Sequence, residues 1–165
     1  MKKIVIITAV LLNTFLMSCS IQEEDVTISE AYKTENIIVF YTQLDYEIAE
    51  LINAYRISQG LNTLNILNEA TKEAITHNQY MVSQGTPSHD YFFVRSQNLK
   101  TTVNALNVSE NVAYGYTSAQ SVVNAWLNSE SHKQNIDNPS FTDFGISSEQ
   151  DQDGKHYYTN IFVKR

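Results

Sequence analysis

The sequence contains very little cysteine and glycine. Its 165 residues include one cysteine, Cys19, and five glycines. With a single cysteine, no disulfide can form within the chain, so the folded domain depends on its hydrophobic core alone. The sequence also has no Gly-x-Ser-x-Gly motif and no glycine-rich phosphate loop. These absences exclude a serine hydrolase of the α/β-hydrolase type and a P-loop nucleotide-binding protein.

Positive charge is scarce as well. The chain has 11 Lys and Arg residues against 18 Asp and Glu residues, which gives a formal net charge of -7. A chain with this acidic surplus is repelled by phosphate backbones, so we expect no nucleic-acid partner. The composition instead fits an ordinary extracytoplasmic domain, and the length is sufficient for one such domain with a single core.

Only one long hydrophobic run is present, and it lies at the N-terminus. It extends from Ile4 to Met17 behind the basic pair Lys2-Lys3, and it is too short to span a bilayer comfortably. The run ends in the sequence LMSC, which is typical of a bacterial lipoprotein-processing site. We therefore interpret residues 1–18 as a lipoprotein signal peptide and Cys19 as a lipidated residue that anchors the protein in a membrane. An ordinary signal peptide with an incidental cysteine is the alternative.

The segment that follows Cys19 is polar and acidic. It begins SIQEEDVTISEAYKTEN and shows little periodicity, so we expect residues 19–40 to form a tether and residues 41–165 to form the domain. Within this segment, the apolar stretch IIVFY (residues 37–41) is predicted as an edge strand or as a segment that docks on the core. With a lipid anchor, this organisation places the protein in the cell envelope, facing the periplasm or on the cell surface.

Four helices are predicted from the spacing of apolar residues. The first follows Thr42 and ends at Gly60, the second covers residues 68–83, the third covers residues 92–99, and the fourth begins after Ser118. Asn68 is a good N-cap for the second helix, and Gly85 ends it. Trp126 lies on the apolar side of the fourth helix and is predicted to be a core residue.

The C-terminal part of the sequence has a different period. FTDFGISSEQ and KHYYTNIFVK contain β-branched and aromatic residues, and the pair Asp153-Gly154 between them is a hairpin signal. We therefore predict a C-terminal antiparallel hairpin. Helices followed by such a hairpin indicate an α+β domain, in which helices cover an antiparallel sheet.

Four histidines are candidates for chemistry. His77 lies inside the second predicted helix, where a packed core histidine is the simpler interpretation and a ligand the alternative. His156 begins the last strand and is predicted to be exposed. His89 lies in a loop after a helix, where functional side chains are often presented. In sequence, His89, Glu110 and His132 are too far apart to form a local metal-binding pattern.

Several motifs in order resemble one protein family. They are LNTLNILNEATKEAITHNQYM, SHDYF, SENVAYGY, SVVNAWLNSESHKQNIDNPSFTDFGIS and YYTNIFVK, which together extend over about residues 42–164. The chain resembles the CAP superfamily (cysteine-rich secretory proteins, antigen 5 and pathogenesis-related 1 proteins), and in particular its disulfide-free bacterial branch. This resemblance implies a three-layer α-β-α sandwich.

The resemblance also implies a cleft. In many members two histidines and two acidic residues line it and can hold zinc or another divalent cation. By motif, His89, Glu110 and His132 are the corresponding residues here. The second acid is in doubt, because Ser129 occupies its place and Glu130 is adjacent. Two imidazoles and one carboxylate can hold zinc with an open position, whereas without a metal Glu110 could accept hydrogen bonds from both histidines.

The resemblance leaves three functions open. The first is a lipid-anchored binding module for an apolar ligand, such as a lipid or sterol, or for an envelope protein. The second is a metal-dependent hydrolase, for example a peptidase, that uses the same cleft. The third is a structural or adhesion module, in which the cluster of His89, Glu110 and His132 only stabilises the fold.

Overall fold

The structure, a computed structural model, describes residues 37–165. The predicted signal peptide, the predicted lipidation site at Cys19 and the tether up to residue 36 lie outside the described residues. The described residues belong to one compact unit, which extends from Lys33 to Arg165. None of the helices in this part of the chain has the length and apolar character needed to cross a membrane.

Five helices and four strands are described in residues 37–165. In chain order they are α2 (Gln43–Ser58), β1 (Asn65–Ile66), α3 (Asn68–Gln84), α4 (Phe92–Val103), β2 (Asn107–Tyr114), α5 (Ala119–Asn128), α6 (Glu130–Asp137), β3 (Asp143–Gln150) and β4 (His156–Lys164). The strands form one sheet in the order β1-β3-β4-β2. β4 pairs antiparallel with β2 and β3, whereas β1 pairs parallel with β3. The predicted α+β class and the C-terminal hairpin are confirmed, although the short β1 makes the sheet mixed.

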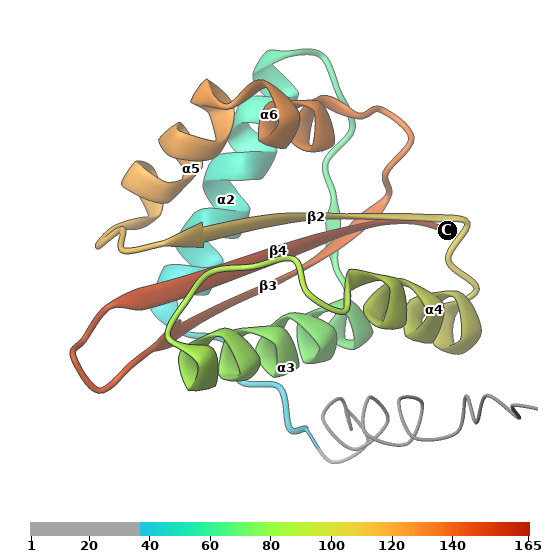
Figure 1. Cartoon of the computed structure of the whole chain (residues 1–165). Coiled ribbons are helices and arrows are strands. Elements are labelled where there is room, and N and C mark those ends of the chain that lie inside the picture. Colours follow the sequence, from blue (N-terminus) through green and yellow to red (C-terminus); the bar gives the residue numbers. More distant parts are fainter. Residues whose placement is uncertain (1–36) are drawn as a thin grey trace, which may run out of the picture. The chain divides into compact units, whose positions relative to one another are not determined.

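The helices lie in two layers on opposite faces of the sheet. Figure 1 shows α2, α5 and α6 on one face and α3 and α4 on the other. This arrangement is the three-layer α-β-α sandwich that the family resemblance implies. Because β2 is last in the strand order, it forms an edge of the sheet between the two helical layers.

Local capping explains where α2 begins and where α3 ends. Thr42 caps α2 through a reciprocal pair of hydrogen bonds with Asp45. α3 ends at Gly85, which has the left-handed conformation (φ 67°) that glycine adopts without strain. Asn68, predicted as the N-cap of α3, is instead its first residue, and Leu67 takes the cap position.

Two further predictions for the fold need correction, and one pair of alternatives is decided. The third helix continues beyond residue 99 to Val103. The fourth helical stretch is two helices, because the chain is extended at Ser129 between α5 and α6. Residues 37–41 do not form a strand. The alternative prediction, a segment that docks on the core, is met at Tyr41. Its hydroxyl donates to Asn68 Oδ1 at 2.8 Å and lies 3.0 Å from the Thr71 hydroxyl, whereas Ile38 and Phe40 are exposed.

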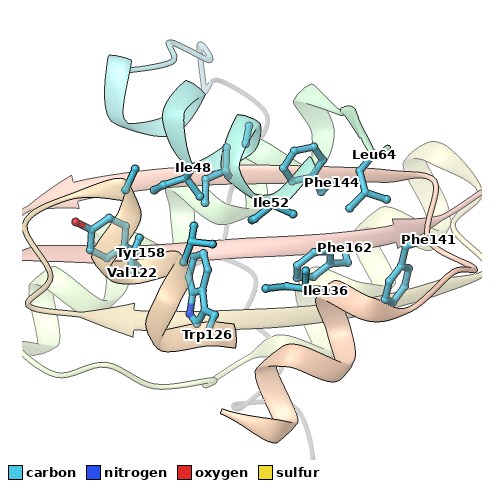
Figure 2. Close-up of a cluster of buried hydrophobic side chains, with 14 residues drawn as sticks. Ile48, Ile52, Leu64, Val122, Trp126, Ile136, Phe141, Phe144, Tyr158 and Phe162 are labelled. Atoms are coloured by element: carbon cyan, nitrogen blue, oxygen red, sulfur yellow. The ribbon is translucent and has the colours of Figure 1, made fainter. Parts of the chain in front are cut away.

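The largest apolar core lies between the sheet and the layer of α2, α5 and α6. Figure 2 shows side chains from all three helices meeting aromatic side chains of β3 and β4. Trp126 is 1% exposed in this core, as predicted, and its indole Nε1 donates to the carbonyl of Val112 at 3.1 Å. The indole therefore joins α5 to the edge strand β2.

The opposite face of the sheet holds two smaller apolar clusters and more polar side chains. α3 lies very close to β3, because a Cβ atom at Gly145 would overlap the backbone of Ala70 and Thr71. Glycine is therefore required at this contact. The polar residues on this face surround the carboxylate of Glu110, which is buried on β2.

Candidate binding cleft at the edge strand

Strand β2 presents its side chains alternately to the two helical layers. Glu110 and Val112 face α3 and α4, where Val112 packs with Met81. Asn111 and Ala113 face α5 and α6, and the Asn111 amide donates to the carbonyl of His132 at 3.0 Å. The residues predicted for the cleft therefore come from both layers and meet at this edge strand.

Glu110 forms a buried ion-pair network with Arg95 and His89. The Arg95 guanidinium donates from Nε to Oε2 and from Nη2 to Oε1 of Glu110, both at 2.8 Å. His89 Nδ1 also lies 2.8 Å from Oε1. The side chains of Arg95 and Glu110 are 0% and 2% exposed, whereas that of His89 is 55% exposed. The network thus connects the interior to an accessible imidazole.

The ionised form of Glu110 is favoured despite its burial. Burial by itself raises the pKa of this carboxyl group, but the hydrogen bond from His89 and the charge and hydrogen bonds of Arg95 outweigh it. The pKa of Glu110 therefore lies below its ordinary value. An ionised carboxylate can only accept hydrogen bonds, so it receives the Nδ1 proton of His89.

His77 lies beneath this network and is fully buried, as the core interpretation predicts. Its Nδ1 is 3.2 Å from the Thr159 hydroxyl and 3.7 Å from Glu110 Oε2. Burial lowers the pKa of His77 to about 4, although the Glu110 charge acts in the opposite direction. His77 is thus a neutral core residue whose ring lies beside the carboxylate of Glu110.

The loop that carries His89 is held from two sides. The third donor of Arg95, Nη1, bonds to the backbone carbonyl of Asp90 at 2.7 Å. The Tyr80 hydroxyl donates to the Asp90 carboxylate at 2.9 Å. Tyr91, the next residue, has φ 58°, a conformation that side-chain-bearing residues rarely adopt and that needs support from its surroundings. Arg95 therefore orients both the loop and the carboxylate next to His89.

His132 approaches the edge strand from the other layer. Its Nδ1 lies 2.8 Å from the Ser129 hydroxyl, at the break between α5 and α6. Burial lowers the pKa of His132, and the neighbouring charge of His89 lowers it further. Of the two further residues considered for the cleft, Ser129 contacts His132, whereas Glu130 is exposed.

A cavity of about 440 Å³ lies beside His132 and crosses the edge strand. It is lined by Pro87, Val112, Ala113, Tyr114, Tyr116, Ala125, Trp126, Ser129 and His132. We call this cavity the edge cleft. Its described lining is mainly apolar and aromatic and includes no acidic side chain. Pro87 belongs to the same loop as His89, so the loop forms one wall of the edge cleft.

A second groove, of about 500 Å³, lies between α2 and the start of α5. It is larger than the edge cleft but lacks histidine and is bordered by two exposed carboxylates, Glu47 and Glu50. Because the convergent polar groups and the shifted pKa values lie at the edge strand, the edge cleft is the stronger candidate for a functional site.

The three predicted residues do not fit a three-ligand metal site in this arrangement. Both oxygens of Glu110 are bonded to Arg95, so a cation on this carboxylate would lie beside the guanidinium charge. Within residues 37–165, no group of three or more His, Cys, Asp and Glu side chains could hold a metal ion. In His89 and His132 the Nδ1 atoms are engaged, which leaves only two Nε2 atoms for zinc or another divalent cation.

Two features of this region are not anticipated in the sequence analysis. Arg95 is absent from the predicted site, although it lies four residues before Leu99 and shares the buried side of α4 with it. An arginine on the buried side of a helix needs an acidic or carbonyl partner, and this signal points to Glu110. His156, predicted to be exposed, is half-buried; it stacks on Tyr158, and its Nε2 lies 2.8 Å from the Gln150 amide nitrogen.

Comparison with known proteins gives consistent matches. The model of the cysteine-rich secretory protein family (CAP) matches residues 49–163. The uncharacterized protein YkwD of Bacillus subtilis is 34% identical over 103 residues, which are 61% of this chain and 40% of YkwD. The uncharacterized membrane protein YlbC of the same organism is 28% identical over 127 residues, which are 75% of this chain and 35% of YlbC. The chain thus spans well under half the length of these curated relatives.

Among solved structures, an outer surface protein of Borrelia burgdorferi has the same fold. The two chains superpose with a TM-score of 0.67 at 28% sequence identity. The match covers 76% of this chain and 96% of the Borrelia protein.

Proposed function

The chain belongs to the cysteine-rich secretory protein (CAP) family, and from this premise we propose that it is a ligand-binding module of the bacterial cell envelope. In this proposal the edge cleft takes up an apolar small molecule, such as a lipid or a sterol-like compound. A lipid on Cys19 anchors the module in a membrane. The relatives support the location, because one is named an outer surface protein and another a membrane protein.

The chemistry of the cleft lining carries this proposal. The cleft volume of about 440 Å³ falls within the range of small-molecule sites, roughly 300–1,000 Å³. Such sites are mainly apolar and carry a few polar groups that orient the ligand. Here Trp126 and two tyrosines supply apolar surface, and His132 and Ser129, which contact each other, supply polar groups. An apolar molecule with one polar end matches this pattern.

A hydrolase is less well supported by the same residues. Hydrolysis at a metal centre needs a water-activating ion and usually a carboxylate that acts as general base. Of the residues predicted for the cleft, Glu110 is the carboxylate that would have to act as general base. Its oxygens are instead hydrogen-bonded to Arg95 and His89. No acidic side chain belongs to the described lining of the edge cleft.

The single tryptophan provides a direct test. Trp126 lines the edge cleft, so a ligand that enters should change its fluorescence. We would titrate the compact unit from Lys33 to Arg165 with a medium-chain monoacylglycerol, kept below its micelle concentration. Saturable binding with a change in Trp126 emission is expected.

Two substitutions of alanine by phenylalanine make this test specific to the edge cleft. Ala125→Phe adds a ring to the lining of the edge cleft and should abolish the saturable signal. Ala54→Phe adds the same ring to the groove between α2 and α5 and should leave the signal unchanged. The proposal is wrong if wild type shows no saturable change, or if Ala54→Phe alone removes it.

A further inference from the structure

The fully buried Arg95 is bonded to the carboxylate of Glu110, which also contacts His89. Arg95 uses three nitrogen donors, two for the oxygens of Glu110 and one for the carbonyl of Asp90. Parallel hydrogen bonds of this kind fix both the position and the plane of a carboxylate. With its plane fixed and its charge balanced, the carboxylate of Glu110 accepts a hydrogen bond from His89 Nδ1 at Oε1.

This arrangement selects one of the two neutral forms of His89. In a neutral imidazole one nitrogen carries the proton and the other is an acceptor. An ionised carboxylate at Nδ1 requires the proton to be on Nδ1, so Nε2 has the free lone pair. Because Nδ1 points inward and the side chain is 55% exposed, Nε2 lies on the accessible side of the ring.

The structure does not select one neutral form of His132. Its Nδ1 partner is the Ser129 hydroxyl, which can either donate or accept a hydrogen bond. Both neutral forms of His132 are therefore compatible with the structure. His132, which lines the edge cleft, and His89, which belongs to the loop that forms one of its walls, are therefore chemically different, and the difference comes from Arg95 and Glu110.

We propose that Arg95 is the positioning residue of the edge cleft: through Glu110 it holds His89 in the form that offers Nε2 to the ligand as a hydrogen-bond acceptor. Through the Asp90 carbonyl it also holds the loop that forms one wall of the cleft. The ligand is then an apolar molecule that carries a hydroxyl or N–H group. This last step rests on the proposed function, whereas the state of His89 does not.

The proton position on His89 can be measured without any ligand. The imidazole nitrogens of ¹⁵N-histidine-labelled protein, from Lys33 to Arg165, would be recorded at about pH 8, where histidine is ordinarily neutral. Protonated and bare nitrogens differ strongly in chemical shift. Wild type is expected to show His89 in a single form, with the proton on Nδ1. A proton on Nε2 would overturn the proposal.

Arg95→Met tests the positioning role, and Arg56→Met is its matched control. Arg56 is also 0% exposed, but it donates only to carbonyl oxygens, of residues 62, 136 and 138, and does not contact Glu110. Both variants should be less stable than wild type. Only Arg95→Met should lose the single His89 form and give a mixture or the Nε2-protonated form.

The outcomes separate a positioning role from a structural one. If folded Arg95→Met retains the wild-type form of His89, Arg95 only stabilises the fold and the proposal is wrong. If Arg95→Met does not fold, Arg95→Lys is measured instead. A lysine keeps the charge but cannot bond in parallel to both oxygens of Glu110, so a partial loss of the single form is expected, and an unchanged form contradicts the proposal.

The same experiments keep this proposal distinct from the proposed function. A single wild-type His89 form without any Trp126 response to monoacylglycerol would refute ligand binding and leave the role of Arg95 intact. A Trp126 response with an unselected His89 would refute the role of Arg95 only. When both hold, Arg95→Met should also weaken binding of the monoacylglycerol about tenfold, as the loss of one hydrogen bond implies.

Discussion

Two fully buried arginines lie on opposite faces of the sheet and have different partners. Arg56, on α2, donates to the side-chain and backbone oxygens of Asn62 and to the carbonyls of Ile136 and Asn138. Arg95, on α4, donates to the carboxylate of Glu110 and to one carbonyl. The first arginine joins α2 to the end of α6 with uncharged acceptors. The second arginine pairs with the carboxylate of Glu110, which is in turn hydrogen-bonded to the exposed His89.

The difference shows how similar buried groups take on different roles. Burial lowers the pKa of Arg56, an effect that the Asp137 charge opposes. The positive charge of Arg56 is thus stabilised mainly by carbonyl dipoles, and the oxygens that accept these hydrogen bonds belong to no ionised side chain. In the case of Arg95, the charge keeps Glu110 ionised, and Glu110 in turn orients His89. The face with α2, α5 and α6 holds the main hydrophobic core, whereas the face with α3 and α4 holds the buried ion pair that contacts His89.

The largest stability effect is expected in the main core. Phe144 is fully buried between β3 and the layer of α2, α5 and α6. Phe144→Ala should lower the free energy of unfolding by about 3–5 kcal/mol, because it removes buried apolar surface and leaves a cavity. Urea unfolding followed by circular dichroism measures this loss. The histidine spectrum at about pH 8 should keep the wild-type His89 form. A loss below about 1 kcal/mol would contradict the central role of this core.

Replacing the two arginines should lower the free energy of unfolding by different amounts. Arg95→Met leaves a buried carboxylate without its cation and should cost about 3 kcal/mol. Arg56→Met leaves carbonyl acceptors without a donor and should cost about 1–2 kcal/mol. Both values come from the same urea experiment. If Arg56→Met proves the more costly of the two, the ion pair at Glu110 contributes less than its geometry implies.

The buried groups His77 and Glu110, on the sheet face covered by α3 and α4, should make the free energy of unfolding depend on pH. The pKa of His77 is lowered to about 4 in the folded protein, whereas an unfolded histidine titrates near about 6.5. Between these values the unfolded chain binds more protons, so the free energy of unfolding falls as the pH is lowered from about 6.5 to 4. The lowered pKa of Glu110 adds to this loss below its ordinary unfolded value of about 4.3.

A variant can assign this pH dependence to His77. His77→Gln retains a hydrogen-bonding side chain near Thr159 and should reduce the dependence between about pH 6.5 and 5, leaving the part due to the lowered pKa of His132. His156→Gln, at the hairpin on β4, serves as the control and should leave the slope due to His77 in place. An unchanged slope in His77→Gln would show that another group is responsible.

The addition of zinc should have the smallest effect of these tests, because we expect it to bind weakly. With Glu110 bonded to Arg95, a cation in the cleft has two imidazoles as protein ligands, fewer than the three of a catalytic zinc site. Calorimetric titration should therefore show binding weaker than micromolar, and His89→Ala should abolish what remains. Binding that is micromolar or tighter and lost in His89→Ala would show that Glu110 exchanges Arg95 for the metal.

The elements that could be predicted from the sequence are those with local signals. α2 and α3 have apolar periodicity, a cap or a terminal glycine, and the hairpin has Asp153-Gly154. Strand β2 lacks such a signal, because the inward position between Val108 and Val112 is occupied by a charged Glu110. That charge is tolerated only because Arg95 lies opposite, and this is tertiary information.

The site could be predicted only in part for the same reason. The motifs that resemble the family point to His89, Glu110 and His132, but they give no partner for the carboxylate. Ser129 beside His132 becomes visible only once the break between α5 and α6 is known. α6 buries one residue, Ile136, so its apolar pattern is too weak to show that it is a separate helix.

The most direct test of the cleft is amide chemical-shift mapping with the monoacylglycerol. We expect the shifts to gather on both sides of the edge strand, in the loop at Pro87, in β2 from Val112 to Tyr114, and at the end of α5 up to His132. Such a pattern would show one ligand held between the two layers. Shifts confined to the groove around Glu47 and Ala54, or no saturable shifts at all, would contradict a binding site at the edge strand.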